Sequence, residues 1–222
     1  MTATLTTTAP VWVLNMGEDE NRFSPIWLTS MEESLARVRT SEEPIALVVT
    51  ASGKFFSNGL DLDWVLANPD QWGDYVSRVQ ALFTNMLTLP VPTVCAINGH
   101  CFAAGAMLAL ACDHRVMRTE RGFFCLPEVD IKIPFSAGMT ALITSKLTPR
   151  AALDATVTGR RYDSAAALEA GIVDLTCDID DLAGSATELV APLAGKDRAT
   201  VAKIKETMFA DVVTALAAPP LM

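Results

Sequence analysis

The chain has 222 residues, half of them hydrophobic, and a formal net charge of -9 at pH 7. This length and composition predict one large domain with an ample core, and they exclude a disordered or fibrous protein. The acidic balance argues against a nucleic-acid or anionic-membrane binder, because such proteins present a basic surface.

Five cysteines lie mostly in apolar runs, with no Cys-x-x-Cys pair and only two histidines beside them. This pattern predicts reduced thiols and no metal site. The most apolar helix, about ten residues long, is too short to span a bilayer. Residues 1–10 have neither a basic start nor a long apolar run, so we expect a frayed N-terminus and not a signal peptide. The end Pro-Pro-Leu-Met differs from a peroxisomal Ser-Lys-Leu signal, and together these features predict a cytoplasmic protein.

Hydrophobic periodicity predicts strands and helices that alternate along most of the chain. This alternation indicates an α/β architecture with right-handed crossovers. The expected strands are 11–14, 45–50, 93–97, 115–117, 123–126 and 172–176. The expected helices are 24–38, 61–66, 72–89, about 103–112, 136–146, 149–157, 164–170, 180–194 and 197–216.

The stretch 98–113 is central to this pattern. It predicts a tight turn at Asn98-Gly99 and then a helix that is apolar on every side, hence buried. The helix starts with small residues, including Ala103, Ala104 and Gly105. A ligand could therefore approach its first N–H groups, which are unpaired and suit an anion or a developing oxyanion. The alternative for this stretch alone is a helix packed tightly on a sheet.

A second loop, 56–61, has the same layout as residues 102–105. Both loops follow a buried strand, contain glycine and small residues, and lead into a helix. Each could direct one backbone N–H to a common point, and two converging N–H donors form an oxyanion hole for an enolate or a tetrahedral intermediate.

Several motifs, taken in order, resemble the crotonase (enoyl-CoA hydratase/isomerase) superfamily: Phe56-Ser-Asn-Gly-Leu-Asp-Leu62, Ile97-Asn-Gly-His-Cys-Phe-Ala-Ala-Gly105, Cys112-Asp113, Pro127-Glu128 and the stretch 158–174. The resemblance implies a ClpP/crotonase fold of stacked ββα units over residues 11–176. It also implies C-terminal helices over residues 177–222 for oligomerisation and pocket cover, homotrimers or dimers of trimers, and acyl-CoA substrates without a separate cofactor. The oxyanion donors would be the N–H groups of Leu60 and Ala104.

The resemblance also bears on the reaction. Hydratases of the superfamily use two glutamates, and here the second falls on Glu128 while the first falls on Met107, which cannot transfer a proton. One base suffices to convert a 3-enoyl-CoA into a 2-trans-enoyl-CoA, and the motifs are most similar to monofunctional 3,2-trans-enoyl-CoA isomerases of β-oxidation. The alternatives are an unusual hydratase and a non-catalytic acyl-CoA-binding homologue. Met107 and Ser136 replace the extra aspartates of dienoyl-CoA isomerases, which disfavours that activity.

The remaining candidates have binding or structural roles. Arg22, Lys54 and a late-helix lysine, Lys203 or Lys205, are expected to contact the CoA phosphates. We expect His100 to hold its turn by a hydrogen bond, and Asp113 to anchor a helix end. Asp130 is expected to be a structural partner or a helper of Glu128. The other expected substrate-binding residues are Ser57, Asn58, Gly59, Asp61, Leu62, Ala103, Gly105, Met107, Pro127 and Phe135, with Leu60, Trp64 and Met139 as further apolar candidates for the acyl pocket.

Overall fold

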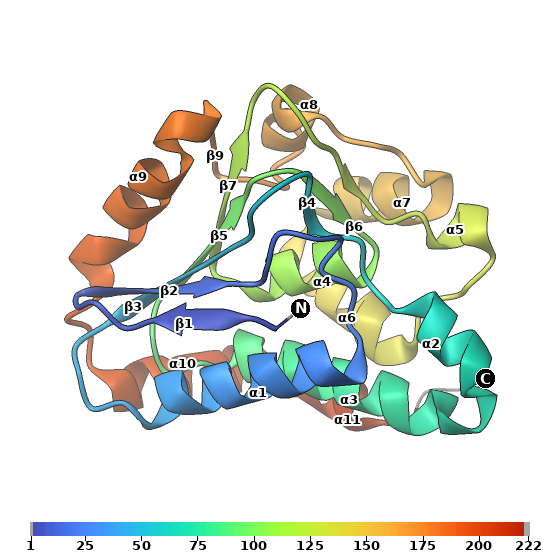
Figure 1. Ribbon diagram of the computed structural model, residues 1–222, viewed down its shortest axis with the longest axis horizontal. Coiled ribbons are helices and arrows are strands. Elements are labelled where there is room, and N and C mark those ends of the chain that lie inside the picture. Colours follow the sequence, from blue (N-terminus) through green and yellow to red (C-terminus); the bar gives the residue numbers. More distant parts are fainter. Residues whose placement is uncertain (1, 220–222) are drawn as a thin grey trace.

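A computed structural model describes residues 2–219 and contains two sheets with helices packed around them (Figure 1). The larger sheet has the order β1-β2-β3-β5-β7-β9, parallel except for the antiparallel pair of β1 and β2. The smaller sheet is parallel and has the order β4-β6-β8. The strands are β1 Thr4–Thr6, β2 Val11–Asn15, β3 Ala46–Thr50, β4 Phe55–Ser57, β5 Thr93–Ile97, β6 His100–Phe102, β7 His114–Arg118, β8 Phe124–Cys125 and β9 Leu175–Cys177.

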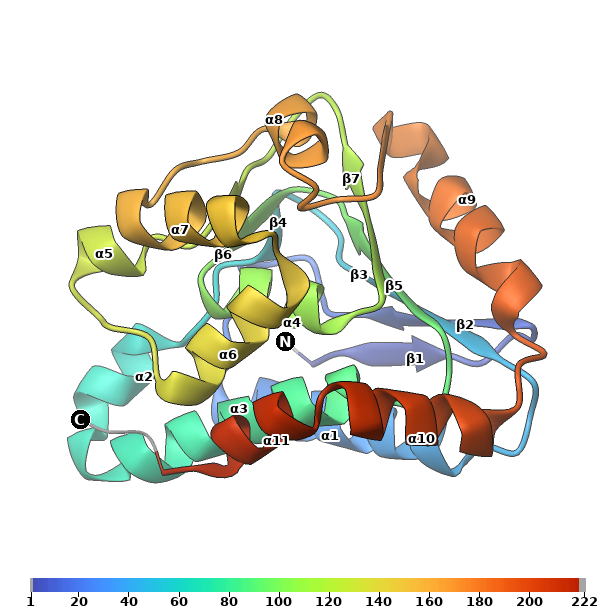
Figure 2. The ribbon, with the colours of Figure 1, turned by 180° about the vertical axis from the view of Figure 1, so that it is seen from behind.

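The helices lie on both sides of the larger sheet. Helices α1, α3, α10 and α11 form a layer along one side, and α9 lies on the other (Figures 1 and 2). Their bounds are α1 Pro25–Thr40, α2 Leu62–Ala67, α3 Trp72–Leu87, α4 Ala104–Ala111, α5 Glu128–Ile131, α6 Ala137–Lys146, α7 Pro149–Thr158, α8 Ser164–Glu169, α9 Ile179–Val190, α10 Arg198–Met208 and α11 Ala210–Ala217, with short 3-10 turns at Pro69–Gln71 and Ala191–Leu193.

The strand sequences explain why both faces of the sheet are covered. In β3, Ala46 and Val48 pack toward α9, whereas Leu47 and Val49 pack into the main core. Side chains of a strand alternate between faces, so an uninterrupted apolar run requires cover on both sides.

Three successive units repeat one arrangement. In each, the first strand joins the larger sheet and the next joins the smaller one, as in the pairs β3–β4, β5–β6 and β7–β8. A helix follows each pair, namely α2, α4 and α5. The predicted ββα units are therefore present, and their helices begin at the same end of the smaller sheet.

The structure corrects several expected elements. Thr4–Thr6 forms strand β1, so the expected frayed segment is ordered there; Met1 and residues 220–222 lie outside the described residues. Strands β4 and β6 were expected as loop and turn, because three residues are too few to show a period. The expected helix 197–216 is interrupted at Phe209, which separates α10 from α11.

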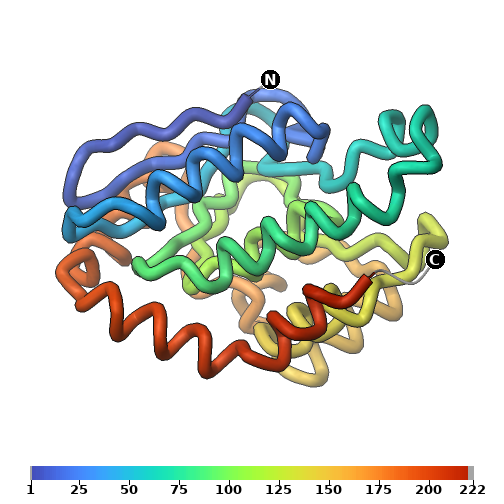
Figure 3. The backbone as a smooth tube through the Cα atoms, turned by 90° about the horizontal axis from the view of Figure 1, so that it is seen from below, coloured from blue at the N-terminus to red at the C-terminus, as the bar shows by residue number. Residues whose placement is uncertain are grey.

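The C-terminal helices pack against their own chain. Helix α11 contacts α6 and α3 so closely that a Cβ added to Gly138 would lie 2.6 Å from the Cα of Leu216. Figure 3 shows the C-terminal segment running beside α3. No described helix has the length and apolar character needed to cross a membrane.

An ion pair between the buried Lys205 and the partly buried Asp113 joins α10 to the end of the central helix. The Nζ of Lys205 donates to Asp113 Oδ2 at 2.6 Å and to the Val91 carbonyl at 2.9 Å, while the same carboxylate accepts from the Thr93 N–H. Asp113 thus anchors the end of α4 to the start of β5, as expected. Lys205 is buried in this pair, so the expected contact with CoA phosphates is not available to it within this chain.

Breaking this pair from one side should destabilise the protein. Lys205→Met leaves the partly buried carboxylate of Asp113 without its cation, which costs on the order of 3 kcal/mol in the free energy of unfolding. Lys203→Met, an exposed neighbour on the same helix, is the matched control and should change it by less than about 0.5 kcal/mol. Urea denaturation measures both values. Equal effects of the two substitutions would contradict this assignment.

Candidate active site

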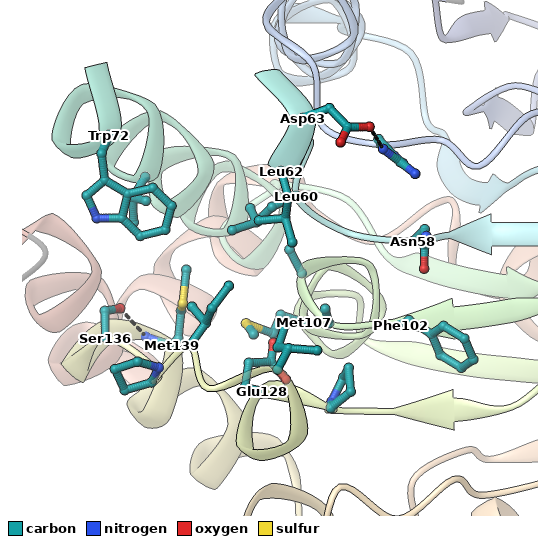
Figure 4. A pocket seen from close by; sticks show the side chains of 18 residues that line it. Asn58, Leu60, Leu62, Asp63, Trp72, Phe102, Met107, Glu128, Ser136 and Met139 are labelled. Carbon is teal, nitrogen blue, oxygen red and sulfur yellow. Dashed lines mark hydrogen bonds and ion pairs between the residues drawn. The ribbon is translucent and has the colours of Figure 1, made fainter. Parts of the chain in front are cut away.

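A cavity of about 350 Å³ opens where the helices α2, α4 and α5 begin. Figure 4 shows Leu60, Met107 and Glu128 projecting into it, with Trp72, Ser136 and Met139 at one end and Asn58 and Phe102 at the other. The complete lining comprises Arg22, Asn58, Leu60, Leu62, Asp63, Trp72, Val76, Phe102, Ala103, Ala104, Met107, Pro127, Glu128, Ile131, Ile133, Pro134, Ser136 and Met139.

Two glycines bring the candidate oxyanion loops into contact. A Cβ added to Gly59 would lie 2.9 Å from the N atom of Ala104, and one added to Gly105 would lie 2.6 Å from Ser57 Cβ. Gly59 also has φ +81°, which side chains rarely adopt. Gly59, Gly105 and Ser57 therefore stay outside the cavity lining but set the approach of its two loops.

The backbone at Ala103 is strained. Its φ of +51° and ψ of -126° are unusual for alanine, and α4 begins at the next residue. Leu60 and Ala104 both line the cavity, and neither N–H has a hydrogen-bond acceptor among the described residues. The two groups are available to an oxygen atom of a ligand, as an oxyanion hole requires.

Further hydrogen bonds fix the loop before α2. Ser57 Oγ donates to the Asn21 carbonyl and accepts from the Gly59 N–H. The Asp61 N–H donates to the Tyr75 hydroxyl, which donates to the Phe23 carbonyl. The side chain of Asp61 caps α2, so its role is structural. Tyr75 was not predicted, because a tyrosine in an amphipathic helix carries no sign of this contact.

Glu128 is the buried carboxyl group of the cavity. It begins α5, is 6% exposed, and its Oε2 has no hydrogen-bond partner among the described residues. Burial raises the pKa of Glu128 to about 7, against a smaller lowering by its own backbone N–H. The carboxyl group is thus suited to accept and return a proton near neutral pH.

The surroundings of Glu128 are apolar. Met107 is 1% exposed and comes from α4, while Ile131 and Met139 contribute further apolar wall. Asp130 is exposed and forms no hydrogen bond with Glu128 among the described residues, so the expected helper role is not supported.

A polar contact lies at one end of the cavity. Ser136 Oγ donates to Gln80 Oε1, and the buried Gln80 amide donates to the carbonyls of Leu216 and Ala218. The C-terminal segment therefore supports the wall of the cavity from behind. None of the described residues from 177 onward lines the cavity itself, and the expected pocket cover by the C-terminal helices stays a prediction.

Of the other expected binding residues, some line the cavity and others lie outside it. Arg22 lines the cavity, but its guanidinium donates to Glu20 at 2.5 Å and to Asp63 at 2.6 Å. These hydrogen bonds raise the pKa of Arg22, the one to Asp63 more than the one to Glu20. Lys54 lies outside the cavity, above the Phe55 ring. Phe135 packs against the core.

The lining also includes residues that the sequence did not single out. Trp72 and Val76 come from α3, and Ile131, Ile133 and Pro134 follow Glu128. The helical period of α3 marked its buried side, but it could not distinguish core contacts from cavity contacts.

Comparison with known proteins assigns the chain to a family. Residues 8–219 match the family described as enoyl-CoA hydratase/isomerase. This chain belongs to that family. The predicted resemblance to the crotonase superfamily is thereby confirmed, and with it the prediction that the chain is an enzyme of this family.

Individual relatives agree with this assignment. Peroxisomal enoyl-CoA delta isomerase 1 of Arabidopsis thaliana is 34% identical over 161 residues, which cover 71% of this chain and 67% of that protein. Carnitinyl-CoA dehydratase of Salmonella enteritidis is 31% identical over 178 residues, covering 80% and 68%. The structure of a probable enoyl-CoA hydratase from Mycobacterium tuberculosis superposes with a TM-score of 0.90 at 26% identity, covering 98% and 92% of the two chains. The predicted crotonase-like fold is confirmed.

Burial of Glu128 has a consequence for stability that is independent of catalysis. Its pKa is about 7 in the folded protein and ordinarily 4.5, so ionisation disfavours the folded state as pH rises from about 4.5 to 7. Glu128→Gln should therefore raise the free energy of unfolding by on the order of 3 kcal/mol at pH 8 and leave it unchanged at pH 4.

Denaturation at both pH values measures this difference. Glu33→Gln, at an exposed position of α1, is the control and should show no such pH dependence. A Glu128→Gln variant that is no more stable at pH 8 than the wild type would show that the carboxyl group is not buried as described.

Proposed function

We propose that the protein is an enoyl-CoA isomerase that converts 3-enoyl-CoA into 2-trans-enoyl-CoA. The observation that carries this proposal is Glu128, the single buried carboxyl group among the described residues of the cavity, beside two N–H groups that have no acceptor among those residues. The delta isomerase named among the relatives supports the same assignment.

The reaction follows from these groups. The thioester oxygen accepts hydrogen bonds from the N–H groups of Leu60 and Ala104. The Glu128 carboxylate takes a proton from C2, and the electrons of the C–H bond delocalise into a dienolate whose charge rests on that oxygen. The protonated Glu128 then delivers the proton to C4, the double bond moves to C2–C3, and the carboxylate is regenerated.

Met107 is the feature that disfavours hydration. A hydratase must position and deprotonate a water molecule, and the thioether of Met107 offers no group for that task. An apolar wall beside Glu128 instead limits protonation of the dienolate by water and the addition of water to the 2-enoyl product. We therefore place the hydratase second and the non-catalytic acyl-CoA-binding homologue third.

We also propose that the protein acts in β-oxidation and associates with copies of itself. Exposed apolar side chains support the association: Val129 on α5 and Leu153 and Val157 on α7 are 48%, 55% and 61% exposed, and these helices contact each other. A trimer remains our prediction for the assembly, and the cytoplasm our prediction for its location.

The direct test is an assay with 3-hexenoyl-CoA that follows the formation of 2-hexenoyl-CoA. The kcat/KM should rise with pH through about 7, because only the ionised Glu128 can accept the C2 proton. Glu128→Gln should lower it on the order of 10³-fold. Asp130→Asn, which removes an exposed carboxylate two residues away, should have little effect. Crotonyl-CoA hydration that exceeds isomerisation would overturn the proposal.

A second substitution tests the role of residue 107. Met107→Glu places a second carboxyl group beside Glu128, where it can help to position water, and it should produce measurable hydration of crotonyl-CoA while isomerisation falls. Met107→Gln has nearly the same size without the acidic group and is the matched control. Equal hydration by both variants would show that the carboxyl group at 107 is not what separates the two reactions.

A further inference from the structure

Phe23 and Tyr75 hold the loop before α2 by hydrogen bonds. The Phe23 N–H donates to the Gly59 carbonyl at 2.9 Å, and the Phe23 carbonyl accepts from the Tyr75 hydroxyl at 3.0 Å. The same hydroxyl accepts from the Asp61 N–H at 2.9 Å. Because Gly59 precedes Leu60 and Asp61 follows it, the loop is held on both sides of a candidate oxyanion donor.

The bond to the Gly59 carbonyl sets the direction of the Leu60 N–H. The two groups belong to one trans peptide, so they point in opposite directions. The carbonyl points to Phe23, which lies outside the cavity lining, and Leu60 projects into the cavity (Figure 4). A peptide whose carbonyl accepts a hydrogen bond also has a more polarised N–H group, which makes that group a stronger donor.

Phe23 is a rigid support because the core holds its ring. The ring stacks on Trp27 with centroids 4.5 Å apart, and it meets the ring of Phe83 edge-on at 6.5 Å. The residue has no exposed surface. Close packing of this kind leaves the Phe23 backbone little freedom, and its hydrogen bonds extend that restriction to the loop.

Tyr75 connects this support to α3. It is 4% exposed, and its ring centroid lies 5.2 Å from that of Trp64 on α2. Burial raises the pKa of the hydroxyl, and the bond from the Asp61 N–H lowers the pKa to a smaller extent. The hydroxyl therefore stays protonated at neutral pH, so it donates to Phe23 while it accepts from Asp61.

The second oxyanion donor is oriented by its own helix. The Ala103 carbonyl accepts from the Met107 N–H at 3.1 Å, a bond within the first turn of α4. This bond orients the peptide that carries the Ala104 N–H. Only the Leu60 donor thus depends on a side chain from a distant segment, among the residues that the structure describes.

A hydrogen-bonding side chain at a site loop was expected at His100. The Nδ1 of His100 has no hydrogen-bond partner among the described residues, so it does not hold its turn in the expected way. We propose that Tyr75 is a positioning residue of the oxyanion hole, which fixes the direction of the Leu60 N–H. This inference rests on the proposed function, because that N–H affects the reaction only if the thioester oxygen binds there.

Removal of one hydroxyl tests the inference. Tyr75→Phe should lower kcat for 3-hexenoyl-CoA on the order of tenfold and change KM by less than about threefold, because a donor to the oxyanion gains strength as charge develops. Tyr162→Phe is the matched control: this buried tyrosine donates to Asp154 and lies outside the cavity lining. Its kcat should change by less than about twofold.

Infrared spectroscopy of a bound thioester separates positioning from a general loss of structure. Hexanoyl-CoA lacks the double bond, so it binds without turnover, and carbon-13 at the thioester carbonyl identifies its stretching band. Hydrogen bonds from the two N–H groups should lower the carbonyl frequency in the wild type. Tyr75→Phe should move the frequency part of the way back toward that of free hexanoyl-CoA, whereas Tyr162→Phe should leave it at the wild-type value.

The two readouts distinguish the possible failures. An unchanged frequency in Tyr75→Phe would overturn the inference, and a fall in kcat shared equally with Tyr162→Phe would do so as well, since it would indicate a structural role. A wild type that lowers the frequency but isomerises no 3-enoyl thioester would defeat the proposed function. The infrared shift in Tyr75→Phe would still decide whether this residue positions the donor.

Discussion

The close approach of two loops is the constraint on which the site depends. Gly59 lies against the first N atom of α4, and Gly105 lies against Ser57, so a side chain at either glycine would push the loops apart. Because the strands β4 and β6 are adjacent in the smaller sheet, their following residues meet at one end. The strained backbone of Ala103 is maintained by this packing, and it leaves the N–H groups of Leu60 and Ala104 available for an oxyanion.

The burial of Glu128 then determines which reaction the N–H groups of Leu60 and Ala104 can assist. Glu128 lies in the apolar part of the same cavity, where desolvation raises its pKa toward neutrality. A carboxyl group at this pKa can take a proton from carbon and return it within one turnover. Met107 offers no proton-transfer group from α4, and the one-base isomerisation that we propose follows from this.

Much of the fold was predictable because the sequences of its central strands and helices are continuous apolar segments. The buried strand β5 and the apolar helix α4 follow directly from residues 93–112. The three-residue strands β1, β4 and β6 were missed, since three residues are too few to show a local period. The break between α10 and α11 at the buried Phe209 was also missed, because the helical period of the sequence carries no sign of it.

The chemical core of the site was more predictable than its outer parts. Motifs located Glu128, Leu60 and Ala104, all of which line the cavity. The partners of charged side chains could not be read from spacing: Arg22 is held by two carboxylates, and Lys205 is buried against Asp113. Such pairs join segments far apart in the chain, and only the folded structure reveals which cations remain uncompensated.

The most direct measurement is the fate of the transferred proton. The enzyme would be given 3-hexenoyl-CoA carrying deuterium at C2, and the product would be analysed for deuterium at C4 after a single turnover in ordinary water. Because Glu128 is buried beside apolar side chains, the account predicts that a substantial fraction of the deuterium is retained and appears at C4. Complete loss to solvent, with the Glu128→Gln variant equally active, would contradict a single buried carboxylate as the carrier of the proton.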